Sequence, residues 1–149
     1  MVFAQRLNAL KDLEHLSTRK LSIKARVDRK ALQDWLDGKY LPRYDAFINI
    51  ANYFEVSLDY LVGLENECYA EYKSEVPIKQ VPDLFVARLK EMLSIRGLNA
   101  HQLAQKMEIE QSTISKWINR VCMPEMVSLL SLAKWLNVSI DYLYGRSPK

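Results

Sequence analysis

The sequence is poor in glycine, proline and cysteine, and it has no long apolar run. Four glycines and five prolines among 149 residues leave few breaks for helices. The apolar runs are too short to cross a membrane, and the first residues lack a basic-then-apolar signal segment. The two cysteines, Cys68 and Cys122, do not have metal or redox spacing. These absences predict a cytoplasmic protein with two reduced thiols and no membrane contact.

Patterns that carry catalysis are lacking as well. The sequence has no glycine-rich loop for phosphate and no nucleophile with a nearby base. The histidines, His15 and His101, stand apart from any metal-ligand spacing. We therefore expect no enzyme activity, no cofactor, no metal site and no small-molecule ligand.

One eight-residue stretch occurs twice. The chain reads VSLDYLVG at residues 56–63 and VSIDYLYG at residues 138–145, 82 positions later. The match continues without a gap towards the start of each copy. Each copy is about the size of the smallest domains that fold alone. The sequence predicts similar domains at residues 1–64 and 84–149, joined by a linker at residues 65–83.

Apolar residues within each copy recur at steps of three and four, which is typical of helices. For the second copy the spacing predicts five helices, at residues 85–96, 99–107, 111–119, 126–136 and 139–144. The predicted fold class is therefore all-α, with two tandem five-helix domains. A three-residue turn between the second and third helix of each copy indicates a helix-turn-helix motif.

The repeated ending is interpreted as structural. Ser57 is placed to cap the last helix of the first copy, and Asp59 lies in its first turn, where the helix dipole favours a carboxylate. Tyr60 and Leu61 are predicted core residues, and Gly63 is predicted to end the helix.

Charge alone does not decide the partner. The net charge of the chain is +3, a balance that neither requires nor excludes nucleic acid. The predicted linker is acidic, and its residues Pro77 and Pro82 favour extended backbone in their neighbours.

The stretch LNAHQLAQKMEIEQSTISKWINR, residues 98–120, resembles phage-repressor-like helix-turn-helix domains of the Cro/C1, xenobiotic-response-element class. The later stretch LAKWLNVSIDYL continues the resemblance. It implies a lambda-repressor-like fold and double-stranded DNA as the partner. The chain departs from the family pattern at Ala100, Glu108 and Arg120, where the family usually has a glutamine, a turn glycine and a helix-ending glycine.

A helix with one free face can enter the major groove if that face carries hydrogen-bonding and cationic side chains. Ile114, Trp117 and Ile118 are predicted to point inward, which leaves a polar face on the third helix of the second copy. The candidate DNA-binding residues of this copy are Gln111, Ser112, Thr113, Ser115, Lys116, Asn119 and His101. Thr113 and Lys116 are suited to phosphates. For His101 two interpretations are open, a phosphate contact or, preferred, an ordinary surface histidine.

The first copy has a different surface. Its candidate DNA-binding residues are Arg29, Lys30, Gln33 and Arg19. The position of Lys116 is taken by Asp34, an acid that would face phosphate. Two interpretations remain open: a DNA surface with another base preference, or a helix that packs against protein.

The leading hypothesis is a sequence-specific DNA-binding regulator that represses transcription by occupying its site. One chain would then carry two readers and recognise an asymmetric site. The alternative is a protein-interaction or antitoxin-like module in which the first copy serves dimerisation or partner binding. The sequence leaves a homodimer open.

Overall fold

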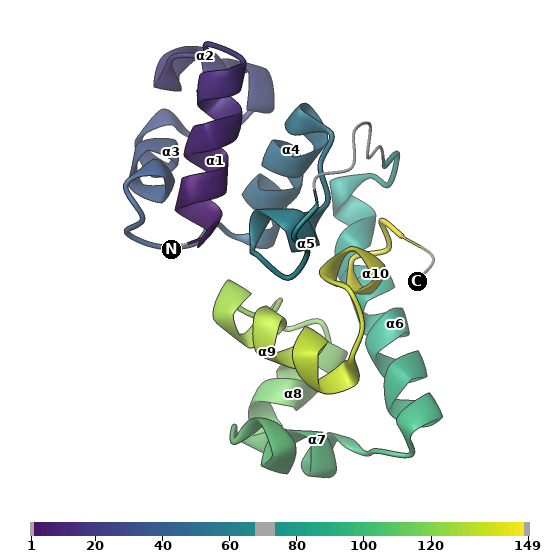
Figure 1. Cartoon of the computed structure of the whole chain (residues 1–149). Coiled ribbons are helices and arrows are strands. Elements are labelled where there is room, and N and C mark those ends of the chain that lie inside the picture. Colours follow the sequence, from purple (N-terminus) through teal and green to yellow (C-terminus); the bar gives the residue numbers. More distant parts are fainter. Residues whose placement is uncertain (1, 68–73, 148–149) are drawn as a thin grey trace. The chain divides into compact units, whose positions relative to one another are not determined.

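The computed structural model describes residues 2–67 and 74–147. Every regular element in these two ranges is a helix (Figure 1). The chain divides into two compact units, Met1–Ser74 and Glu75–Lys149, called unit 1 and unit 2 below. The predicted all-helical fold class is confirmed over the described residues.

In its described residues, unit 1 is built from the helices α1 (Val2–Leu13), α2 (Thr18–Ala25), α3 (Arg29–Leu36), α4 (Tyr44–Phe54) and α5 (Leu58–Leu61). Each of these helices contributes to one apolar core. The fully shielded side chains include Leu7, Leu21, Leu32, Phe47 and Leu61. Burying one such side chain stabilises the fold by about 1.5–3 kcal/mol.

In its described residues, unit 2 contains a short 3-10 helix, η1 (Ile78–Gln80), followed by α6 (Val81–Arg96), α7 (Ala100–Met107), α8 (Gln111–Ile118), α9 (Met126–Leu136) and α10 (Ile140–Leu143). Its core is formed in the same way by Phe85, Leu103, Ile114, Leu129 and Leu143. The five predicted helices of this part are confirmed, and only the start of α6 differs by more than one residue.

α6 begins inside the segment predicted as the linker, residues 65–83. Val81 is fully buried, and Pro82 occupies the first turn of the helix. An amide N–H is not needed for helical hydrogen bonding in that turn, so proline fits there, and the extended backbone expected around Pro82 is wrong. Part of the predicted linker, residues 68–73, lies outside the described residues, and so do its Cys68, Tyr69 and Tyr72.

Helix ends in the two units follow one scheme. Among the described residues each unit has five with positive φ, and every one of them has a counterpart 82 positions away. The pairs are His15 with Gly97, Arg26 with Glu108, Gly38 with Arg120, Glu55 with Asn137, and Gly63 with Gly145. Left-handed backbone lets the last carbonyls of a helix find amide donors. Glycine occupies only four of these ten positions. At the other six, a residue with a Cβ adopts left-handed backbone, which costs it conformational energy.

Gly63 and Gly145 form the only pair in which both members are glycine, and packing explains why. A Cβ on Gly145 would lie 2.5 Å from Leu84 Cδ1 and 3.1 Å from Leu84 Cβ. A Cβ on Gly63 would lie 2.9 Å from Val2 Cγ1. By contrast, a Cβ on Gly97 would meet nothing within 4 Å. The glycine of the repeated ending is required by its backbone conformation and by the side chain that covers it.

An arginine from the first helix of each unit holds the repeated ending. Arg6 donates hydrogen bonds to the carbonyls of Tyr60 and Glu65, and its guanidinium lies 4.2 Å from the centre of the Tyr60 ring. Arg88 donates to the carbonyls of Tyr142 and Ser147, at 3.0 and 2.9 Å, and stacks 4.3 Å from the Tyr142 ring. Tyr60 is half-buried, so the prediction that it anchors the core is wrong. Its ring stacks on a cation instead.

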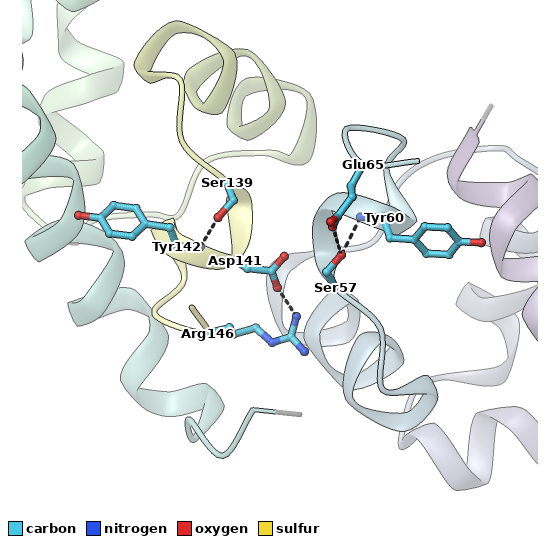
Figure 2. Close-up of polar contacts among 7 residues, drawn as sticks. All are labelled: Ser57, Tyr60, Glu65, Ser139, Asp141, Tyr142 and Arg146. Carbon is cyan, nitrogen blue, oxygen red and sulfur yellow. Dashed lines mark hydrogen bonds and ion pairs between the residues drawn. The ribbon is translucent and has the colours of Figure 1, made fainter. Parts of the chain in front are cut away.

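The residues around this ending differ between the units (Figure 2). In unit 2, Asp141 Oδ1 and Arg146 NH1 form an ion pair at 2.5 Å, and both side chains are almost fully buried, at 3% and 1% exposure. Unit 1 has Leu64 at the place of Arg146. There, Ser57 caps α5 as predicted, accepting from the Tyr60 amide at 3.0 Å, and its hydroxyl donates to Glu65 Oε2 at 2.9 Å.

Candidate nucleic-acid interface

α7 and α8 form the helix-turn-helix of unit 2. Asn99 starts α7 with a capping box, in which its side chain accepts from the Gln102 amide at 2.8 Å and Gln102 Oε1 accepts from the Asn99 amide. Glu108 ends α7 in left-handed conformation, φ 57°. The turn therefore keeps the glycine-type geometry although it carries an acid.

α8 turns its apolar stripe inward as predicted. Ile114 and Trp117 are buried, and Ile118 is half-buried. The opposite face carries the candidate side chains. Gln111, Ser112, Lys116 and Asn119 are exposed, and Thr113 and Ser115 are half-buried. A single helix face thus brings together amide, hydroxyl and ammonium groups, which are suited to base edges and phosphates.

His101, the remaining candidate in unit 2, lies on α7 beside Gln111. Its Nδ1 is 3.3 Å from Gln111 Oε1, a hydrogen bond in which the imidazole donates when Nδ1 carries the proton. Ser112 Oγ donates to Glu110 Oε2 at 3.3 Å. The first helical turn of α8 is therefore oriented by its neighbours before any ligand arrives. The hydrogen bond between His101 and Gln111 was not predicted, because the two residues lie on different helices, ten positions apart.

Few cations are available on the helix-turn-helix of unit 2. Lys116 is exposed on α8. Lys106 lies 5.8 Å from the ring of Trp135, and Arg120 is engaged by Asp83 of α6, with Nε and Oδ1 2.6 Å apart. Glu108 and Glu110 add two exposed carboxylates next to the candidate residues. This surface is polar but is not basic.

α2 and α3 form the corresponding motif of unit 1, and its four candidate residues Arg19, Arg29, Lys30 and Gln33 are all exposed. Arg26 occupies the left-handed turn position, φ 58°. Ser17 and Asp28 cap the two helices, as their side-chain oxygens accept from the amides of Lys20 and Ala31 at 3.1 and 2.9 Å.

The polar residues on α3 bond to one another and to their neighbours. Gln33 Oε1 accepts from Thr18 Oγ1 at 3.2 Å, and Gln33 Nε2 donates to Asp37 Oδ1 at 3.0 Å. Asp34 forms an ion pair with Lys39 at 3.3 Å and accepts from the Tyr40 hydroxyl at 3.3 Å. These contacts were not predicted, although Gln33 and Asp37 are four residues apart, a spacing at which helix side chains meet.

Loss of water contact, together with the Asp34 carboxylate, raises the pKa of Tyr40 above its ordinary value. The Tyr40 hydroxyl therefore remains a donor to Asp34 at neutral pH.

The described residues contain no cluster of three or more histidine, cysteine, aspartate or glutamate side chains that could hold a metal ion. No helix in residues 2–67 and 74–147 is long and apolar enough to span a membrane.

Comparison with known families agrees with the geometry of unit 2. Residues 86–147 match the model of the bacteriophage CI repressor helix-turn-helix domain. This stretch is similar to phage-repressor helix-turn-helix domains, and the matched family is not a class of enzymes. Neither a curated protein nor a solved structure matches the chain.

Proposed function

We propose that this protein is a sequence-specific double-stranded DNA-binding regulator that represses transcription by occupying its site. The observation that carries the proposal is the exposed polar face of α8, in a domain that matches the CI repressor family. The major groove is wide enough to admit such a helix, and its N-terminal residues contact the bases. A protein with this role acts in the cytoplasm on chromosomal or phage DNA.

Each candidate residue of unit 2 then has a role that follows from its chemistry. Gln111 and Ser112, in the first turn of α8, read base edges together with Ser115 and Asn119 further along the same face. Lys116 and Thr113 bind phosphate oxygens, which position the helix without carrying sequence information. A homodimer would place two such helices on a symmetric site, and one chain alone would bind an asymmetric one.

Replacing Gln111 by alanine tests the reading of bases. A good amide contact to a base contributes about 1–3 kcal/mol of discrimination, so the ratio of cognate to scrambled affinity should fall by about 5–150-fold. The measurement is a titration of both duplexes at one salt concentration, after the cognate site has been found by selection from random DNA. Gln5→Ala, an equal truncation at an exposed position of α1, serves as control. If the ratio of cognate to scrambled affinity is unchanged in Gln111→Ala, Gln111 does not contact bases.

Replacing His101 by alanine tests whether Gln111 is held in place by α7. The bond restricts the rotamers of Gln111, so less conformational freedom is lost on binding. Its removal should lower discrimination at the base pair read by Gln111 by about 0.5–1.5 kcal/mol, as for an ordinary hydrogen bond. The readout is affinity for sites altered one base pair at a time. In the double variant with Gln111→Ala, the loss from His101→Ala should vanish. Additive losses would show that His101 acts on DNA by itself.

A further inference from the structure

We infer that unit 1 binds the DNA phosphate backbone without reading bases, while unit 2 supplies the sequence preference. This inference rests on the proposed function of unit 2. It assigns to the two units different parts of binding: unit 1 contributes affinity that depends on salt, and unit 2 contributes discrimination. The sequence had suggested that both units recognise bases. We now assign base recognition to unit 2 and phosphate binding, called the anchor below, to unit 1.

The first observation is the charge of the motif in unit 1. Residues 18–30, which cover α2, the turn and the start of α3, contain six cations and one acid. The cations are Arg19, Lys20, Lys24, Arg26, Arg29 and Lys30, and all six are exposed. Within the described residues none of them takes part in an ion pair. The corresponding residues 100–112 of unit 2 contain one cation and two acids.

The second observation is that the amide and the two carboxylates in the last part of α3 and at its end are already engaged or unsuited to DNA. Gln33 already accepts from Thr18 and donates to Asp37. Asp34, at the place of Lys116, is held by Lys39 and Tyr40. A bidentate contact of Gln33 with a base would have to break these bonds. The carboxylates of Asp34 and Asp37 would also oppose close approach to the groove.

The position of the cations fits a phosphate backbone better than a groove. In a docked helix-turn-helix the first helix crosses the backbone while the second enters the groove. Arg19, Lys20 and Lys24 are on that first helix, and Arg26 is in the turn. Arg29 and Lys30 belong to the first turn of α3, where the positive end of the helix dipole also favours an anion. Phosphates would therefore meet cations on α2, in the turn and in the first turn of α3, where the Asp28 carboxylate is their one acidic neighbour in residues 18–30.

Joining such an anchor to a reader has a consequence for affinity. The helix-turn-helix of unit 2 has few free cations, so its electrostatic contribution to DNA binding is small. Once unit 1 is on the backbone, unit 2 searches the adjacent DNA at a high effective concentration. The whole chain can then bind DNA tightly although the helix-turn-helix of unit 2 attracts phosphates only weakly, because that of unit 1 attracts them strongly.

The test uses the full chain carrying Arg19→Ala and Lys20→Ala. Each neutralised phosphate contributes about 0.9 to the slope of log affinity against log salt, so the double variant should lower the slope by about 1.8. Its affinities for cognate and scrambled duplexes should fall by equal factors. The control, Lys79→Ala with Lys90→Ala, removes two exposed cations from η1 and α6 and should leave the slope nearly unchanged. Gln33→Ala should leave base preference unchanged.

Two results would overturn the inference while leaving the proposed function intact. A slope equal to that of the control would place the basic surface away from DNA and favour a protein partner for unit 1. A change in base preference for Gln33→Ala, or for the Arg19 and Lys20 variant, would make unit 1 a reader. If the unaltered chain binds cognate and scrambled duplexes equally, the sequence-specific function fails, and the inference fails with it.

Discussion

Replacing Arg146 by methionine is expected to lower the free energy of unfolding of unit 2 by about 3–5 kcal/mol. The substitution leaves the Asp141 carboxylate almost fully buried and removes the guanidinium 2.5 Å away. A buried charge is costly when its counter-charge is lost, whereas an intact buried pair is close to neutral. Since domains of this size are stabilised by only a few kcal/mol, unit 2 should lose most of its stability.

Unit 1 provides the matched control for this variant. Leu64, at the place of Arg146, is exposed, so Leu64→Met should change stability by less than about 0.5 kcal/mol. Adding Asp141→Asn to Arg146→Met removes the buried charge and should restore part of the loss. Denaturant titration read by hydrogen exchange, resolved into peptides of each unit, measures both effects. Equal losses for Arg146→Met and Leu64→Met would show that the ion pair contributes nothing.

Replacing Gly145 by alanine is expected to destabilise unit 2 by about 2–3 kcal/mol. Left-handed backbone costs a residue with a Cβ about 1–2 kcal/mol, and the new methyl would also press against Leu84, 2.5 Å from its Cδ1. The contact adds to the backbone cost because the Cβ of Leu84 is itself only 3.1 Å away, too near for a change of rotamer to clear the space.

Gly97→Ala separates the two contributions, because φ there is +63° but nothing lies within 4 Å of the added Cβ. It should cost only the backbone part, about 1–2 kcal/mol. In the background of Leu84→Ala, the cost of Gly145→Ala should fall to the same value. Thermal or urea unfolding of the four variants gives the comparison. Identical losses for Gly97→Ala and Gly145→Ala in the unaltered background would rule out a role for Leu84.

Much of the fold was predictable because its determinants are local. Ser57 caps α5, and Gly63 adopts left-handed backbone after it, both as expected from the repeated ending. Apolar spacing also placed Ile114 and Trp117 in the core. These features depend on residues a few positions apart, which the sequence displays directly.

Other features depend on residues that only the fold brings together. Tyr60 was predicted to be a core residue of the repeated ending, but it is half-buried, and its ring and carbonyl contact Arg6, 54 positions earlier. Arg120 was described only as a departure from the family pattern, whereas in the fold it lies just past the end of α8 and forms an ion pair with Asp83 of α6. Such contacts require the relative placement of helices, which periodicity does not supply.

The same reason limits prediction of the site. The exposed face of α8 follows from the pattern of its apolar residues. His101 bonds to Gln111 and Thr18 bonds to Gln33, each from the preceding helix, so the sequence alone could not show which amides are free to bind a ligand.

The arginine of each first helix has a consequence for how the units unfold. Arg88 bonds to carbonyls 54 and 59 positions later, and Arg6 does the same in unit 1. The two ends of each unit are thereby fastened to one another, so neither end can fray alone without breaking long-range hydrogen bonds. Opening becomes cooperative, with amides of the first and last helices exchanging at similar rates.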